Sequence, residues 1–295
     1  MGPRYYNGAS HWIHYGRILM FHLPPGPKLM RRVVFNQKGG VGKTSITCNL
    51  AAIGAAQGYR TLVVDLDVQG NTTHYLVGEI DAEAFPAEAQ GVAGLFKQTV
   101  GSRKMRQNPD SFVWETPYEN LFLMPSSPVL SDMEKELESR YKIYKMRDAL
   151  EKLEGEYDRV YIDTPPNFNF YSKSALIAAH TVLVPFDCDS FARQSLYTLM
   201  DNIAELQEDH NPDLEVEGVV INQFNSQARL PGELVAELEE EGYPVLNTYL
   251  NTSVKMKESH RDHRPLIDLA PSHKLTAQYL DLHAELEKSL ARRAA

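Results

Sequence analysis

The sequence predicts a single α/β domain in which a mainly parallel, twisted sheet is covered by helices on both faces. From Arg31 onward, strand-like runs, turns and helix-like stretches alternate, which is the order typical of parallel strands joined by crossover helices. Several runs, such as Val-Tyr-Ile and Val-Leu-Val, are apolar without interruption, as expected for strands buried on both faces. A glycine-rich turn directly follows the first run. We find no internal repeat, so one domain over residues 30–295 is the simplest account.

Apolar runs along the chain indicate the strands of this sheet. In chain order, the expected strands are 32–36, 61–65, 121–124, 159–163, 182–186, 216–221 and 245–249. Helices are expected between them, including 131–153, 190–207 and 273–291, and one helix that begins near Lys43. In the last stretch, apolar residues recur at helical spacing: Leu275, Tyr279, Leu282, Leu286 and Leu290. This stretch is largely acidic until Arg292 and Arg293, so we expect it to pack on the domain rather than bind a membrane.

Composition and charge restrict the class of protein. The chain has 295 residues and a formal net charge of -9, from 39 acidic and 30 basic residues. This acidic balance argues against a protein that coats nucleic acid with its whole surface, and it confines any DNA contact to a local basic patch. Cys48 and Cys188 are the only cysteines, which excludes a disulfide scaffold and favours a reducing, cytoplasmic setting. No apolar run approaches the roughly 18 residues of a membrane span.

The first 29 residues differ in composition from the rest of the chain. They are rich in Tyr, His, Gly and Pro and show neither helical nor strand periodicity. We interpret residues 1–29 as an extension outside the fold, either disordered or upstream of a natural start at Met30; a short partner-binding arm is the alternative. Because so few residues precede the glycine-rich turn, we expect no helix-turn-helix domain and no sequence-specific operator binding.

The glycine-rich turn has the composition of a phosphate-binding loop. Successive glycines let backbone N–H groups turn inward around phosphate oxygens, and the following helix adds the positive end of its dipole. A polyphosphate is therefore the expected ligand. Within such a loop, Lys43 would reach the β- and γ-phosphates, and the hydroxyl of Thr44 would bind magnesium. The expected nucleotide-binding residues are Gly39, Gly40, Val41, Gly42, Lys43, Thr44 and Ser45.

The loop departs from the standard motif in an informative way. The first glycine of the standard motif is replaced by Gln37, and a lysine, Lys38, follows it. KGGVGKT is a deviant Walker A sequence, and the chain here resembles the ParA/MinD family of P-loop ATPases. Three later stretches resemble that family in the expected order: VDLDVQGN at 64–71, with Val68 in place of the usual proline, RVYIDTPP at 159–166, and the nucleotide-base strand at 218–222. The resemblance covers residues 31 to about 285.

Position along the strands, together with this resemblance, assigns roles to individual residues. Asp163 lies at the tip of an apolar strand, where it can hold the shell of Mg²⁺ through water, and Asp65 is expected to support that shell. By resemblance, Asp67 positions the water that attacks ATP. The resemblance also implies that Lys38 crosses a dimer interface to the partner's nucleotide, so that dimerisation depends on ATP. Asn222 resembles the family's adenine-contacting asparagine; a structural asparagine that caps the strand is the alternative.

Other segments resemble the ParA/Soj branch of the family. Residues 168–196 are similar to partition ATPases, and the segments at 254–259 and 263–266 resemble V-R-L-S-E-A and G-K-P-[IV] there. Lys255 falls where those proteins carry a basic residue for sequence-independent DNA binding. We therefore expect weak binding to the phosphates of duplex DNA through Lys255, Lys257 and Arg264, with Arg229 as a further candidate. A solvated helix face of mixed charge is the alternative.

The resemblance implies a slow ATPase with ATP and Mg²⁺ as cofactors. It would act as an ATP-dependent homodimer on nucleoid DNA and position a plasmid, a chromosome or a protein cluster, with hydrolysis stimulated by a ParB-like or small adaptor protein. A MinD-like membrane-associated ATPase and an ATP-binding adaptor without turnover remain alternatives. Electron transfer of the nitrogenase iron-protein kind and cobyrinate-type amidation are disfavoured, because the cysteines do not supply a cluster or a glutamine-hydrolysing module.

Overall fold

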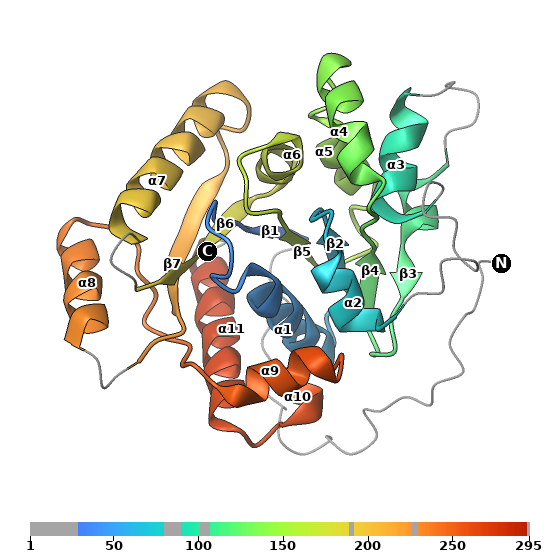
Figure 1. Cartoon of the computed structure of the whole chain (residues 1–295). Coiled ribbons are helices and arrows are strands. Elements are labelled where there is room, and N and C mark those ends of the chain that lie inside the picture. The colour runs from blue at the N-terminus through green and yellow to red at the C-terminus, as the bar shows by residue number, and fades with distance from the viewer. Residues whose placement is uncertain (1–28, 80–89, 101–106, 189–191, 226–228, 294–295) are drawn as a thin grey trace.

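The sheet and its covering helices are seen in a computed structural model, which describes residues 29–79, 90–100, 107–188, 192–225 and 229–293 (Figure 1). Apart from Leu29, the expected N-terminal extension lies outside these residues. Within them, the strands form one seven-stranded sheet of order β3-β4-β2-β5-β1-β6-β7. All neighbouring strands are parallel except β3, which pairs antiparallel with β4. The predicted fold class is therefore confirmed.

Six of the expected strands are present in this sheet with small shifts at their ends. The strands are β1 (Met30–Val34), β2 (Thr61–Asp65), β3 (Trp114–Glu115), β4 (Leu121–Met124), β5 (Arg159–Asp163), β6 (Thr181–Asp187) and β7 (Glu215–Asn222). The two-residue edge strand β3 was not predicted, because two residues show no periodicity.

The prediction of a strand at 245–249 is wrong. Only Val245 forms a bridge, to Val219. The N–H of Leu246 still donates to the carbonyl of Val219, but the N–H groups of Asn247 and Thr248 turn away from the sheet and donate to the carboxylate of Glu285, at 2.8 and 3.0 Å. A side chain from the C-terminal helix thus takes the donors that a strand would use, and the segment runs beside β7 without a regular ladder.

The helices connect the strands as expected, with one correction. They are α1 (Lys43–Ala56), α2 (Asn71–Val77), α3 (Gly91–Val100), α4 (Leu130–Ser139), α5 (Lys145–Lys152), α6 (Phe170–Ala178), α7 (Ala192–Asp209), α8 (Arg229–Glu240), α9 (Val254–Arg261), α10 (Leu266–Leu269) and α11 (Lys274–Arg293), with a 3₁₀ turn at Pro109–Phe112. The single helix predicted at 131–153 is wrong, because the chain turns at Tyr141, whose φ is +53°. This turn lets Leu137 and Met146 reach the same core from two helices.

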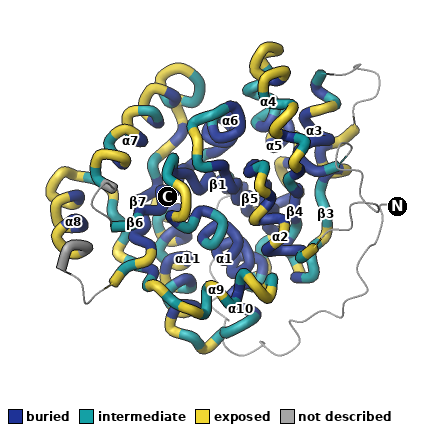
Figure 2. Tube along the Cα trace, in the orientation of Figure 1, coloured by how far each residue is buried: buried dark blue, intermediate teal, exposed yellow. Residues whose placement is uncertain are grey.

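Helices cover both faces of the sheet and create two separate cores. In the view of Figure 1, α3 to α7 lie above the sheet, and α1, α2 and α9 to α11 lie below it. Neighbouring residues of β1 show the alternation: Val33 belongs to the upper core and Val34 to the lower one. The central strands β1, β2 and β5 are almost wholly buried between the two layers (Figure 2). Burial on both faces explains the uninterrupted apolar runs.

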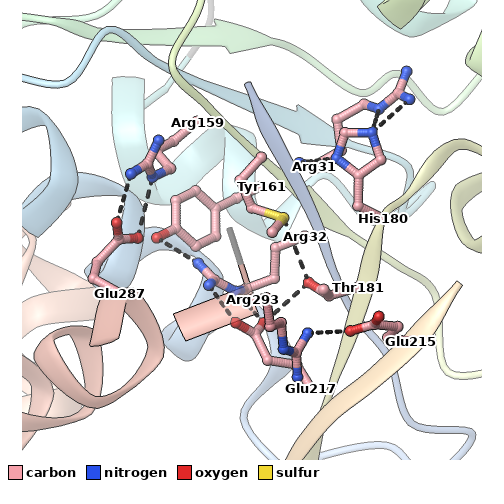
Figure 3. Close-up of polar contacts among 11 residues, drawn as sticks. Arg31, Arg32, Arg159, Tyr161, His180, Thr181, Glu215, Glu217, Glu287 and Arg293 are labelled. Atoms are coloured by element: carbon pink, nitrogen blue, oxygen red, sulfur yellow. Dashed lines mark hydrogen bonds and ion pairs between the residues drawn. The ribbon is translucent and has the colours of Figure 1, made fainter. Parts of the chain in front are cut away.

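The C-terminal helix α11 is attached to the lower face by apolar packing and by buried charge. Its five predicted apolar residues are all buried, which confirms that it packs on the domain. Glu287 of α11 also forms a bidentate ion pair with Arg159 of β5, at 3.1 and 2.5 Å, and both side chains are at most 4% exposed. A second buried pair, Arg32 with Glu217, lies beside it (Figure 3). None of the helices that the structure describes is long and apolar enough to cross a bilayer.

Candidate nucleotide site

The phosphate-binding loop connects the carboxyl end of β1 to the first turn of α1. Gly40 and Gly42 have φ values of +78° and +92°, a region that favours glycine. Gly42 is the residue before α1, and no side chain of the described residues caps this helix. The amides of the first turn are therefore available to an anion, which also gains from the helix dipole. The structure thus brings the predicted residues 39–45 together as a loop and a helix start suited to phosphate.

Lys43 and Lys38 lie on the same loop but in different surroundings. Lys43 is only 7% exposed, and its ammonium donates to the carbonyl of Lys38 at 3.0 Å. Burial lowers the pKa of Lys43, and the charges of Asp163 and Asp67 act in the opposite direction. A partly desolvated ammonium gains strongly from a phosphate placed next to it.

The ammonium of Lys38 lies at the outer side of the loop. Its Nζ contacts both carboxylate oxygens of Asp187, at 2.9 and 2.7 Å, and the two side chains are 31% and 23% exposed. The backbone of Lys38 is also held, because its N–H donates to Asn36. Asp187, at the end of β6, was not predicted as a site residue. The pair shows that Lys38 is placed at the surface, within reach of solvent and of any molecule that docks there.

The two strand-end carboxylates Asp65 and Asp163 lie opposite each other in the register of β2 and β5. Asp163 Oδ2 accepts hydrogen bonds of 2.7 Å from Thr44 and from Thr72, while its Oδ1 is buried without a partner among the described residues. Burial raises the pKa of both carboxyls, and the charge of Asp163 raises that of Asp65 further. A nearby cation would favour the ionised forms. A buried oxygen donor set containing Thr44 and Asp163 is suited to Mg²⁺.

Asp65 and Asp67 have different surroundings although they are two residues apart. The carboxylate of Asp65 accepts hydrogen bonds from the N–H of Asp67 and from the N–H and hydroxyl of Thr73, at 3.2, 2.8 and 2.6 Å. Asp65 therefore holds the loop that carries Asp67. Asp67 itself accepts from the N–H of Gln69 at 3.0 Å, and its carbonyl accepts from Ser126 at the end of β4. These bonds hold the backbone that carries Asp67, and the charge of its carboxylate acts on Lys43 of the phosphate loop.

Several supporting residues were missed by the sequence analysis. Thr72 and Thr73 follow directly on the recognised 64–71 segment, so two hydroxyls next to an acidic loop were a usable signal. Ser126 carries no such signal, because only the pairing of β4 with β2 brings it to Asp67.

Asn222 and Gln223, at the end of β7, hold the loop from the other side. Asn222 Nδ2 donates to the carbonyl of Val41, and Gln223 Nε2 donates to the carbonyl of Gly40, both at 2.8 Å. A Cβ atom on Gly42 would lie 2.2 Å from Asn222 Nδ2. Asn222 thus supports the loop in this structure, and its contact with adenine remains a prediction.

The predicted DNA-binding residues gather only in part. Lys255 and Lys257 lie on α9, and Arg264 follows that helix. Lys255 pairs with Glu258, and Arg264 pairs with Asp268 at 2.6 Å, so part of the local positive charge is balanced. Lys257 is exposed. Arg229 begins α8, and its side chain lies outside the described part of the chain.

Known proteins with similar sequence or structure agree with this geometry. Residues 31–216 match the family model described as an AAA domain. The chromosome partitioning protein ParA of Myxococcus xanthus is 30% identical over 96% of this chain and 92% of its own length. The sporulation initiation inhibitor protein Soj of Bacillus subtilis is 30% identical over 86% of this chain and 96% of its own length.

A solved structure supports the cofactor prediction. Cobyrinic acid a,c-diamide synthase of Mycobacterium smegmatis, with bound ADP and magnesium, has a TM-score of 0.72 and 26% identity, and the match covers 87% of this chain and 93% of the synthase. An adenine nucleotide and magnesium are thus bound by a protein with this fold, as expected for ATP and Mg²⁺ here. Taken with the loop, the two strand-end carboxylates and the second lysine Lys38, these similarities show that the chain belongs to the ParA/MinD family of deviant Walker A ATPases.

Proposed function

We propose that this chain is an ATP-hydrolysing switch that dimerises with MgATP, binds duplex DNA without sequence preference, and segregates or positions a plasmid, chromosome or protein-cluster cargo. The observation that carries the proposal is the different position of the two lysines of one loop. Lys43 is buried against the loop interior, whereas Lys38 is held at its surface beside Asp187. The ammonium of Lys43 can bind the phosphates of the nucleotide in the same subunit, and the ammonium of Lys38 can bind those of the nucleotide in a second subunit.

The nucleotide chemistry follows from the residues around the loop. The amides of residues 39–45 and Lys43 would hold the phosphates, and Thr44 and Asp163 would hold Mg²⁺, with Asp65 as second support. Magnesium bound there would offset the charge that develops on the phosphate oxygens. Asp67 would orient the attacking water, with its backbone held by Asp65 and Ser126. Hydrolysis to ADP and phosphate would then weaken the interaction between the two subunits.

The DNA contact would come from α9 and the residues after it. Exposed Lys257, together with Lys255 and Arg264, offers positive charge to phosphates, and the acidic partners of Lys255 and Arg264 keep each contact weak. Two copies in a dimer would double the number of phosphate contacts, which makes binding depend on the nucleotide. Such a protein would be cytoplasmic and nucleoid-associated. A ParB-like or small adaptor protein is the partner expected to stimulate hydrolysis.

Amidation of the cobyrinate kind is less well supported than partition. Glutamine hydrolysis by such enzymes needs a reactive thiolate. Cys48 is completely buried, and burial raises the pKa of its thiol well above the usual value. Cys188 is partly buried and packs against the upper core. The two partitioning and sporulation relatives are also more similar in sequence than the synthase, at 30% identity each.

Two loop variants and a control test the switch. Asp67→Ala should bind a non-hydrolysable ATP analogue and dimerise, yet release phosphate at least about 100-fold more slowly than the wild type. Lys38→Gln should bind the analogue but remain monomeric in sedimentation. Lys152→Gln, at an exposed position of α5, should behave as wild type in both assays.

Retention on random-sequence duplex DNA completes the test. The wild-type protein should be retained only when the analogue and magnesium are present. An Asp67→Ala variant that turns over ATP normally, or a wild-type protein that stays monomeric with the analogue, would contradict the proposal. Equal DNA retention without nucleotide would contradict its DNA-binding part, and co-sedimentation with anionic vesicles would favour the membrane alternative.

A further inference from the structure

We propose that His260 is a positioning residue that couples the nucleotide loop to α9, so that ATP and DNA strengthen each other's binding. The inference rests on the proposed role of α9 in DNA binding and adds the residue through which the two sites communicate. His260 lies in the last turn of α9, on the same helix as Lys255 and Lys257.

The imidazole of His260 contacts the first turn of α1. Its Nε2 shares a hydrogen bond of 2.8 Å with the hydroxyl of Ser45, a residue 215 positions earlier in the chain. Ser45 follows Thr44, whose hydroxyl donates to Asp163. A movement of the Thr44 hydroxyl from Asp163 toward a metal ion would therefore act on the turn to which His260 is bonded.

A second path from the same carboxylate reaches the same ring through α2. Thr72 donates to Asp163 from the first turn of α2, and Tyr75 follows one turn later on that helix. The ring of Tyr75 is stacked on His260, with centroids 4.4 Å apart and planes within 9°. The Tyr75 hydroxyl also contacts Ser259 of α9 and accepts a hydrogen bond of 3.1 Å from Asn49 of α1.

Through these contacts His260 of α9 connects its helix to both α1 and α2. Burial lowers the pKa of the imidazole, and the charge of His263 acts in the same direction, so the ring is neutral near pH 7. A neutral ring suits both the hydroxyl bond and the aromatic stack. Both hydroxyl groups that hold Asp163 are adjacent in structure to groups that hold this ring, so a change at the metal site biases the placement of α9.

Coupling between two ligands is reciprocal and can be measured as a ratio. The ratio is the dissociation constant of a non-hydrolysable ATP analogue without DNA divided by that with saturating random-sequence duplex. Coupling between two sites of one protein is typically about 5- to 150-fold, and we expect the wild-type ratio to lie in that range. A residue that only stabilises the fold would change stability or both affinities without changing this ratio.

Three substitutions separate coupling from packing. His260→Phe keeps the stack on Tyr75 and removes the bond to Ser45, so the ratio should fall clearly below the wild-type ratio, to the part that dimerisation alone supplies, while analogue affinity without DNA is retained. His260→Gln keeps a hydrogen-bonding group and should restore part of the ratio. The matched control is His210→Phe, because His210 also bonds a hydroxyl, that of Tyr144 at 2.8 Å, but belongs to the opposite layer of helices; it should leave the ratio unchanged.

The outcomes are distinguishable. A wild-type protein that does not bind DNA, or whose ratio is 1, overturns the proposed function and this coupling together. A wild-type ratio above about 5 that His260→Phe and His260→Gln both leave unchanged overturns the role of His260 alone. A low ratio in His260→Phe with partial recovery in His260→Gln supports it, and thermal unfolding with the analogue shows that the variants are folded.

Discussion

Substitution of Gly42 by alanine tests whether the conformation of the phosphate loop is held by Asn222. Gly42 has φ +92° and ψ +22°, a left-handed conformation that side chains rarely adopt. A Cβ atom there would also lie 2.2 Å from Asn222 Nδ2, which donates to the carbonyl of Val41. The variant must therefore accept backbone strain and displace an amide that holds the loop.

The size of the effect can be estimated from these two contributions. Left-handed backbone costs a non-glycine residue about 1 to 2 kcal/mol, and loss of the Asn222 hydrogen bond adds about 0.5 to 1.5 kcal/mol. The total is about 1.5 to 3.5 kcal/mol, which equals about 12- to 320-fold if it appears entirely in nucleotide affinity. Should the loop keep its shape, the loss appears in stability instead. The sum of the two losses is the quantity that the structure predicts.

Two measurements on each variant give this sum. Urea denaturation without ligand gives the free energy of unfolding, and titration calorimetry with a non-hydrolysable ATP analogue and magnesium gives the binding free energy. Asn222→Ala removes the side-chain amide with which the new Cβ of Gly42→Ala would clash. The summed free-energy loss of the double variant should therefore be about 1 kcal/mol smaller than the losses of the two single variants added together. A summed loss below about 0.5 kcal/mol in Gly42→Ala, or strict additivity in the double variant, would refute the reasoning.

Other parts of the structure give three further predictions. Glu287→Met should lower the free energy of unfolding by about 3 kcal/mol in urea denaturation, because it leaves Arg159 buried and unpaired. The double variant with Arg159→Met should recover most of this loss. A double variant that loses as much stability as Glu287→Met alone would contradict the prediction. Burial lowers the pKa of His283 to about 4, against about 6.5 in the unfolded chain. The unfolded chain therefore binds this proton first, and stability falls by about 3 kcal/mol as the pH drops from about 6.5 to about 4. His283→Leu should reduce this dependence of the free energy of unfolding on pH, and an unchanged dependence would contradict the prediction. Lys257→Gln should weaken binding to duplex DNA and reduce the slope of log affinity against log salt by about 1, while an unchanged slope would exclude a phosphate contact.

Features encoded by neighbouring residues were predictable from the sequence. The phosphate loop was recognised because its chemistry depends on adjacent glycines and the start of a helix, all within residues 39–45. The central strands were recognised because burial on both faces requires uninterrupted apolar runs. The predictions that failed involve distant contacts: Glu285 captures the amides of Asn247 and Thr248, and the turn at Tyr141 is stabilised by a core shared between α4 and α5.

The sequence alone determined that a nucleotide loop of the deviant Walker A type follows the first strand of an α/β domain. Only the tertiary structure decided what surrounds that loop. Lys38 meets Asp187 across 149 positions of the chain, Asn222 supports Val41 across 181, and His260 reaches Ser45 across 215. Local sequence pattern carries no information about such partners, because they become neighbours only when the parallel strands bring their carboxyl ends to one edge of the sheet and the helices pack beside them.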